Sequence, residues 1–300
     1  MSKKTKNWLL TGFALILIGC ILFASTMSTI GWSFMKLSTK KFETNNYILS
    51  EPFKNISIIA DTADISFVPS KDSEISVVCY ETENLRHHVT VEDGRLEIKP
   101  LDTRRWYEFI GIGFGTPKIT VSLPAGEYGA LSVTAATSDV NIPENFTFKT
   151  IDIALSTGDV TNHASSLENT TIKTSTGNII LEKLSAASLD LTVSTGRAIL
   201  YDITCDKLTS EGDTGKISMK NVVATEKMSI ERSTGDVKFE NCDAAEMFIE
   251  TDTGDVKGSL LSDKVFVTKT DTGNINVPST LSGGRCEITT DTGDINITIN

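Results

Sequence analysis

The sequence has few of the residue types that carry acid–base or metal chemistry. It contains three histidines, His87, His88 and His163, and five cysteines with no Cys-x-x-Cys spacing, so a zinc motif has no support. Lysine and arginine number 28 against 39 acidic residues, which gives a formal net charge of −11. Nucleic-acid binding needs a basic surface. We therefore predict no nucleic-acid partner and no cofactor.

The one long apolar run lies at the N-terminus. Residues 7–35 carry no charge, and this length exceeds the ~20 residues needed to cross the hydrocarbon core of a bilayer. Lys3, Lys4 and Lys6 precede the run, so the positive-inside rule places the N-terminus in the cytoplasm. We expect residues 1–36 to form a cytoplasmic start and a single-pass anchor in the cell membrane, with the rest of the chain extracellular.

Two other interpretations of this run stay open. The sequence Leu17-Ile18-Gly19-Cys20 resembles a bacterial lipoprotein box with Cys20 as the acylated residue, although the residues after Cys20 stay apolar where lipoproteins usually turn polar. A cleaved signal peptide needs a shorter apolar core and a small-residue cleavage site. The length of the run favours an uncleaved anchor.

A tetrapeptide built on Thr-Gly recurs through the second half of the chain. It is preceded by Ser or Asp and usually followed by Asp or Asn, and successive glycines are 19 or 20 residues apart. A fixed period near 20 with a turn signal in every copy is typical of a solenoid. The pairs are Thr157-Gly158, Thr176-Gly177, Thr195-Gly196, Thr214-Gly215, Thr234-Gly235, Thr253-Gly254, Thr272-Gly273 and Thr292-Gly293.

Apolar and polar residues alternate on both sides of each Thr-Gly pair, which predicts two half-buried strands per coil. Two earlier segments, residues 56–67 and 131–142, match the repeat with Ala63 and Ser138 at the glycine position. Since an obligatory positive φ would exclude Ala and Ser, these substitutions indicate close packing at the corner. We predict an all-β fold, a single-stranded β-solenoid with coils of about 19 residues, after one transmembrane helix.

The region before the regular repeats divides by composition. Residues 37–54 are polar and are predicted to be a connector. Residues 55–130 form an N-terminal β region with the first coil and a hairpin at Asp93-Gly94, and residues 131–300 carry the solenoid repeats.

An aromatic loop interrupts this N-terminal β region. Its apolar side chains either cap the open first coil or form an interaction loop, because exposed apolar patches mark interaction sites. The aromatic residues are Trp106, Tyr107, Phe109 and Phe114.

Acidic residues flank the last Thr-Gly pairs. Their main interpretation is turn chemistry, since Asp and Asn bond nearby backbone N–H groups. A calcium site is the alternative, because like charges stacked ~4.8 Å apart repel by about 0.9 kcal/mol in water and calcium takes oxygen ligands. The candidate ligands are Asp252, Asp255, Asp271, Asp291 and Asp294.

Nothing in the repeats indicates catalysis. The coils are uniform and short, and the serines before Thr-Gly have no positioned histidine beside them. A polysaccharide-acting β-helix enzyme is the distant alternative. A solenoid that ends at its last coil exposes unpaired backbone groups, which favours end-to-end homo-oligomers.

These features together resemble one bacterial family. The Lys-rich start, the anchor, the Thr-Gly coils and the stretch from Trp106 to Thr120 are similar to the β-solenoid domain of unknown function called "putative adhesin", found in Gram-positive membrane proteins. The resemblance covers about residues 45–300. It implies a non-enzymatic surface module that contacts the cell envelope, a protein or another cell. Some relatives resemble accessory proteins of envelope-stress operons, which implies a regulatory ectodomain as the alternative.

The three interpretations of the N-terminus predict different mature chains. Mass spectrometry of the protein purified from membranes should show the uncleaved N-terminus, because the apolar run is long enough to remain in the bilayer. A chain beginning at an acylated Cys20, or one lacking the whole run, would contradict the anchor.

Overall fold

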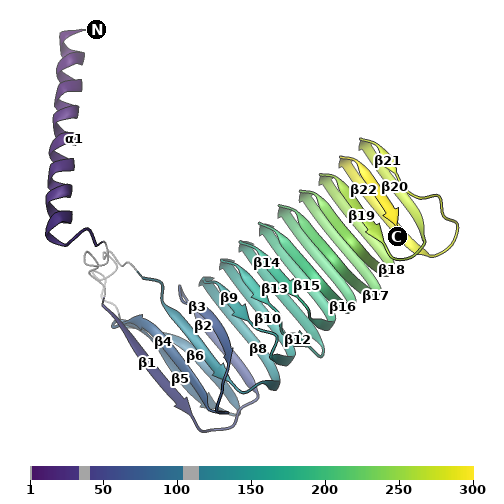
Figure 1. Ribbon diagram of the computed structural model, residues 1–300, viewed down its shortest axis with the longest axis horizontal. Helices are drawn as coiled ribbons and strands as arrows, with labels where there is room; N and C mark the ends of the chain where they lie inside the picture. Colours follow the sequence, from purple (N-terminus) through teal and green to yellow (C-terminus); the bar gives the residue numbers. More distant parts are fainter. Residues whose placement is uncertain (1, 34–40, 104–114) are drawn as a thin grey trace.

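One helix and 23 strands make up the protein, as described by a computed structural model for residues 2–33, 41–103 and 115–300 (Figure 1). The strands form an elongated stack of coils, with the first strands at one end and the last coils at the other. The all-β solenoid predicted from the repeat is confirmed, with about nine turns.

The helix and the strands of the N-terminal end and the first coils are α1 (Lys3–Thr29), β1 (Phe42–Leu49), β2 (Asn55–Ala60), β3 (Asp64–Pro69), β4 (Ile75–Thr82), β5 (Leu85–Glu92), β6 (Arg95–Asp102), β7 (Lys118–Leu123), β8 (Gly126–Thr137), β9 (Val140–Ile142), β10 (Phe146–Thr157) and β11 (Val160–Asn162). The later strands are β12 (Ser165–Ser166), β13 (Asn169–Thr176), β14 (Ile179–Glu182), β15 (Ser185–Thr195), β16 (Ala198–Thr214), β17 (Ile217–Thr234), β18 (Val237–Thr253), β19 (Val256–Leu260), β20 (Lys264–Thr272), β21 (Ile275–Asn276), β22 (Gly284–Thr292) and β23 (Ile295–Ile299).

Helix α1 has the length and composition of a membrane-spanning segment. It covers 27 residues, and its most apolar window is not buried against the rest of the described chain. The Ser2 hydroxyl caps its N-terminus by accepting a hydrogen bond from the Thr5 backbone N–H at 3.2 Å. The predicted apolar helix is confirmed, while its orientation across a membrane stays a prediction.

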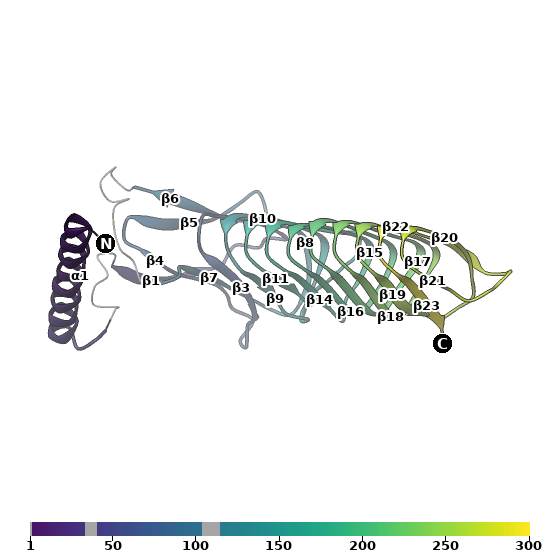
Figure 2. The same ribbon diagram turned by 90° about the horizontal axis from the view of Figure 1, so that it is seen from above.

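Two mostly parallel faces run the length of the stack, one on each side of the Thr-Gly corner (Figure 2). Strands β16, β17 and β18 are long enough to contribute to both faces. The face that follows the corner has the order β1-β4-β7-β3-β9-β11-β14-β16-β17-β18-β19-β23-β21. The face that precedes it has the order β5-β6-β2-β8-β10-β13-β15-β16-β17-β18-β22-β20.

The core is a continuous column of apolar side chains between these faces. In-register pairing places like residues over one another, as with Ile172 on β13 and Leu191 on β15. Both side chains are almost fully buried. No coil can bury its own apolar face, so each depends on its neighbours for stability.

Glycine is required at the sharp corner because consecutive coils approach there without room for a side chain. A Cβ on Gly177 would lie 2.0 Å from the Gly158 carbonyl oxygen, and the φ of Gly177 is +146°. The Gly177 N–H donates to the Thr195 carbonyl of the next coil at 2.9 Å. Ala63 and Ser138 do not have a positive φ, so the backbone of the first two corners differs from that at Gly177.

The opposite corner is built from left-handed residues that are not glycine. Lys183, Asp202, Asn221 and Asn241 have φ between 53° and 55°, a conformation that Asn and Asp tolerate better than most residues. The Asn221 side-chain amide donates to Asp202 Oδ1 at 2.7 Å. Amide side chains therefore link successive coils at the second corner.

The last coils do not stack in the order of the sequence. Strand β18 pairs with β22, and β22 pairs with β20. On the other face β19 pairs with β23, and β23 with β21. The C-terminal coil is thus inserted between two earlier ones, and β20–β21 forms the distal coil. Because the C-terminal coil lies inside the stack, the exposed end expected to favour end-to-end homo-oligomers is the β20–β21 coil, and such assembly stays a prediction.

The N-terminal end is closed by antiparallel strands. The Asp93-Gly94 hairpin is confirmed, with Glu92 paired to Arg95. Strand β1 falls in the segment predicted to be a connector, because its pairing with β4 is nonlocal and its own sequence is mostly polar.

The inserted coil predicts which cysteine pairs can be cross-linked. Lys257 and Asn296 are direct partners, whereas Asn276 lies one coil farther away, about 9.6 Å from Lys257. A thiol reagent of short span should bridge the pair Lys257→Cys and Asn296→Cys, seen as a mobility shift on a denaturing gel. The matched pair Lys257→Cys and Asn276→Cys should stay unbridged, and the reverse pattern would indicate stacking in sequence order.

Candidate functional site

The predicted interaction loop cannot be placed. Trp106, Tyr107, Phe109 and Phe114 all lie outside the described residues, so both proposed roles of the loop stay predictions.

The acidic corner residues form a hydrogen-bonded ladder between coils. The Asp294 N–H donates to Asp255 Oδ1 at 2.9 Å, and the Asn274 N–H donates to Asp294 Oδ1 at 2.8 Å. Lys257, which donates to Asp255, and this backbone bond hold the pKa of Asp255 below its usual value. The position after the glycine thus supplies acceptors for backbone N–H groups of the neighbouring coil.

The remaining calcium candidates, Asp252, Asp271 and Asp291, are exposed on the other side of the same corners. Within the described part of the chain, no three of the five candidate aspartates bring carboxylate oxygens within 4.8 Å of one another. Calcium binding at these corners stays a prediction.

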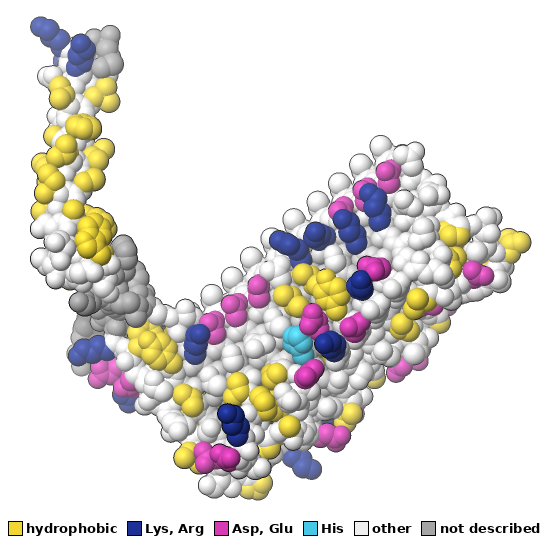
Figure 3. All heavy atoms as spheres, viewed as in Figure 1, with side chains coloured by type: hydrophobic (Ala, Val, Ile, Leu, Met, Phe, Trp, Pro, Cys, Tyr) yellow, Lys and Arg dark blue, Asp and Glu magenta, His cyan; other side chains and the backbone are white. Residues whose placement is uncertain are grey.

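Rows of charged side chains run along one side of the rod (Figure 3). Several charged side chains of the solenoid neutralise one another locally. Lys257 Nζ lies 2.6 Å from Asp255, Lys220 Nζ 2.8 Å from Glu240 and Lys269 Nζ 3.0 Å from Asp271. Exposed pairs of this kind contribute little to stability, and their mutual neutralisation gives no reason to infer a charged ligand.

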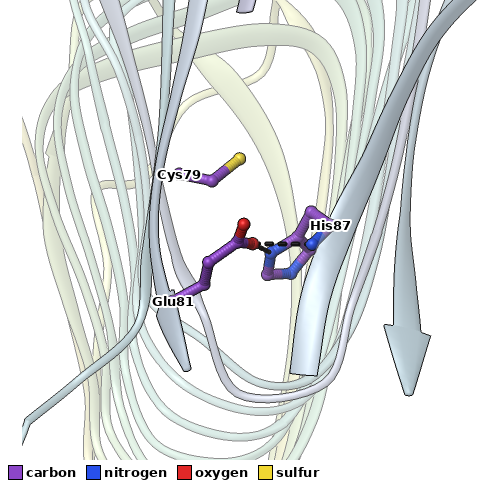
Figure 4. A group of neighbouring side chains, drawn as sticks. All are labelled: Cys79, Glu81 and His87. Carbon is purple, nitrogen blue, oxygen red and sulfur yellow. Dashed lines mark hydrogen bonds and ion pairs between the residues drawn. The ribbon is translucent and has the colours of Figure 1, made fainter. Parts of the chain in front are cut away.

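A buried polar cluster lies at the N-terminal end of the stack (Figure 4). It consists of Cys79 and Glu81 on β4 and His87 on β5, whose ligand atoms all lie within 4.8 Å of one another. Cys79 and Glu81 are 0% exposed and His87 is 5% exposed. The pleat of β4 directs Cys79 and Glu81 to the same inner face, because they are two residues apart.

Three hydrogen bonds satisfy the Glu81 carboxylate. Asn45 Nδ2 on β1 donates to Oε1 at 2.7 Å. The His87 backbone N–H donates to Oε2 at 2.6 Å, and His87 Nδ1 donates to the same oxygen at 2.7 Å. Tyr47 on β1 donates its hydroxyl to the His87 carbonyl at 3.1 Å. The cluster therefore joins β1, β4 and β5.

The thiol of Cys79 is neutral in this environment. Burial, and then the neighbouring Glu81 carboxylate, raises its pKa to about 12. Burial also raises the pKa values of Cys205, Cys242 and Cys286, and these thiols pack as small buried hydrophobic side chains.

Sequence reasoning missed this cluster. Glu81 continues the inward alternation of Val77 and Cys79, so a carboxylate at an apolar position was the available signal. His87 could not be assigned to it, because the packing of β4 beside β5 depends on the closure of the whole N-terminal end.

A buried arginine also breaks the apolar core. Arg232 is 3% exposed, and its Nη2 donates to Ser210 Oγ at 2.7 Å. Burial lowers its pKa to about 10. A Cβ on Gly212 would lie 2.9 Å from Arg232 Nη1, so the glycine makes room for the guanidinium. This group is enclosed by the rod and does not face a partner.

The distal coil is the most apolar exposed part of the solenoid. Strand β20 pairs only with β22 among the described strands. Ile275 on β21 is 45% exposed, whereas the equivalent Ile295 in the next coil is fully buried. Val267 is 47% exposed, and Leu281 in the loop after β21 is 97% exposed. Hydrophobic side chains are visible at this tip in Figure 3.

The fold and these features define a class of protein, a β-solenoid preceded by an apolar helix. The chain belongs to the Toastrack DUF4097 family, whose model matches residues 53–221 and again residues 199–300. The predicted family resemblance is confirmed at this level. No curated protein matches the sequence.

Several solved structures share the fold, including the three that follow. One is described as a "putative adhesin" from Parabacteroides merdae, with TM-score 0.53, 14% identity and coverage of 87% of this chain and 97% of that one. Another is a "putative lipid binding protein" from Parabacteroides distasonis, with TM-score 0.51, 16% identity and coverage of 87% of this chain and 98% of that one. A further "putative adhesin" from P. distasonis has TM-score 0.50, 9% identity and coverage of 86% of this chain and 98% of that one. At these identities the likeness concerns the fold alone, and the Gram-positive assignment stays a prediction.

The hydrogen bonds of Glu81 predict a large cost for its removal. Glu81→Ala leaves the buried donors of His87 unpaired and removes one of the two carboxylates that the half-buried Asn45 amide contacts. It should lower the free energy of unfolding by about 3 kcal/mol. Urea unfolding followed by circular dichroism measures the change. Glu240→Ala, which removes an exposed partner of Lys220, should cost less than ~1 kcal/mol. Equal effects of the two substitutions would contradict the structural role of the cluster.

Proposed function

We propose that this protein is a non-enzymatic contact module of the cell surface, held by α1 in the cell membrane with its N-terminus in the cytoplasm. The solenoid presents its distal coil to a partner on the envelope or on another cell. The single observation that carries the proposal is the exposed apolar surface of Val267, Ile275 and Leu281 at the end of the rod opposite β1.

The distal coil has the physical properties of a protein-binding edge. Among the described residues, strand β20 is paired along one edge only, and an open strand edge can accept a further strand. Val265 and Val267 stand on its outer side, at 40% and 47% exposure. Covering such side chains contributes about 25 cal/mol for each Å² of apolar surface removed from water. A partner strand would therefore gain both backbone hydrogen bonds and apolar contact.

The regulatory alternative is favoured by a different element. Helix α1 exposes apolar residues on all sides within the described chain, including Phe13, Ile16 and Leu22. In a membrane such a helix can pack against the helix of a second membrane protein. Under this alternative the partner, such as a sensor kinase, is held through α1, and the solenoid reports on the envelope outside.

Substitutions at the tip should weaken adhesion without unfolding the rod. Proteoliposomes carrying the full chain are mixed with bacterial cells or isolated cell envelopes, and the bound fraction is measured. Val267→Lys combined with Leu281→Asp should lower binding at least tenfold, because a charge in an apolar contact costs more than ~1.4 kcal/mol. Both side chains are exposed, so the fold should be retained.

The matched control is Ile48→Lys, which changes a 61% exposed isoleucine on β1 at the opposite end. It should bind like the unaltered protein. Loss of binding in the control and not in the tip variant would overturn the proposal. Capture of a membrane protein from detergent extracts that depends on α1, with no cell binding, would favour the regulatory alternative.

A further inference from the structure

We propose that Cys79, Glu81 and His87 form a site for a divalent metal ion of the zinc class, which fastens the two faces of the solenoid at its N-terminal end. The sulfur, carboxylate oxygen and imidazole nitrogen lie within 4.8 Å of one another in a buried position (Figure 4).

The three side chains match the ligand preferences of zinc. Zinc binds Cys sulfur at ~2.3 Å, His nitrogen at ~2.0–2.1 Å and carboxylate oxygen at ~2.0–2.2 Å. A thiolate together with an imidazole selects against magnesium and calcium, which prefer oxygen ligands alone. Three protein ligands leave a fourth position, which a water molecule or the second oxygen of Glu81 can fill. No other group of three His, Cys, Asp or Glu side chains converges in this way in residues 2–33, 41–103 and 115–300.

The surroundings of Glu81 are those of an oriented metal ligand. Asn45 Nδ2 donates to Oε1, which turns Oε2 toward the imidazole of His87. Polar partners of this kind fix the orientation of ligating groups in metal sites. The other buried cysteines differ, because in the described part of the chain neither Cys205 nor Cys242 belongs to a group of three such ligands.

The position of the cluster in the fold indicates a structural role for the ion. Strand β4 belongs to one face of the solenoid and β5 to the other, and among the described residues their backbones pair as strands only at Thr82 and Leu85. Within the same described part of the chain, no further coil stacks outside β1 and β5 to hold the faces together. An ion bound to Cys79 and Glu81 on β4 and to His87 on β5 would close this end, as a terminal cap must in a repeat protein.

Metal binding exchanges protons in a balanced way. The Cys79 thiol loses its proton to solvent and binds as thiolate. The hydrogen bond between His87 Nδ1 and Glu81 Oε2 is replaced by bonds from both groups to the ion, and the imidazole stays neutral by carrying its proton on Nε2. One proton is released for each ion bound.

Cobalt is the probe of choice, because Co²⁺ adopts zinc geometry and gives a sulfur-to-metal charge-transfer band. The full chain in detergent is freed of metal with a chelator and titrated with Co²⁺. We expect one equivalent to bind, with a charge-transfer band that one equivalent of Zn²⁺ abolishes. Elemental analysis of the protein purified without chelator should find about one zinc per chain.

Conservative variants separate ligation from folding. Cys79→Ser and His87→Gln roughly keep the size of the side chains, and the amide introduced by His87→Gln can still donate a hydrogen bond to Glu81. Both variants should lose the band and lower Co²⁺ affinity at least tenfold while keeping the β-sheet circular dichroism spectrum. Cys205→Ser, the matched change of a buried cysteine that belongs to no such group of ligands, should bind like the unaltered protein.

Two results would overturn the metal site. One is an unaltered chain that binds no Co²⁺ or Zn²⁺ at micromolar concentration. The other is a charge-transfer band that persists in Cys79→Ser, which would assign the sulfur to another cysteine. In either case the cluster would be a hydrogen-bonded clamp without metal.

Discussion

The close approach of successive Thr-Gly corners is the constraint on which the solenoid depends. A Cβ on most of the repeat glycines would lie about 2 Å from the carbonyl oxygen of a neighbouring coil, so any other residue would force the coils apart. The glycine N–H bonds the next threonine carbonyl, and the in-register ladders of both faces follow from that spacing. The period of 19 or 20 residues is therefore the chain length needed to go once around a core of fixed cross-section.

In a stack of this kind, only the middle coils have a neighbour on both sides. The two ends, which lack one neighbour, are built in different ways. At the first end the faces are extended by antiparallel strands, and the interior polar cluster of Asn45, Glu81 and His87 holds them together. At the distal end the C-terminal coil is inserted within the stack, which leaves β20–β21 outermost. The first end is thus closed by buried hydrogen bonds, whereas the distal end is open and exposes apolar side chains. For this reason we propose that a partner binds at the distal end.

The sequence predicts what is local and repeated. Each Thr-Gly corner and its flanking alternation lie within one coil, so the all-β solenoid, its coil length and the hairpin at Asp93-Gly94 could all be inferred from the sequence. The cluster could not, because Glu81 and His87 meet only through the closure of two faces. The order of the last coils could not be inferred from the period, because the period alone does not choose whether β20 or β22 stacks on β18. The acidic corners suggest calcium because the charges are visible in the sequence. The backbone N–H groups that donate to Asp255 and Asp294 are visible only in the structure.

The departures from the core pattern nevertheless carry information about the ends and the interior. Five residues before the corner glycine, most coils place isoleucine or leucine, as at Ile249 and Ile288. Ser210 breaks this column because its hydroxyl accepts from Arg232. Thr268 breaks it in the distal coil, where it is only half-buried because no further coil of the described chain covers it. A hydroxyl costs little at a position that water reaches and much more in a closed core, so Thr268 marks the outermost coil in the sequence itself. A polar residue in a core column of a solenoid therefore indicates either an internal partner or an end of the stack.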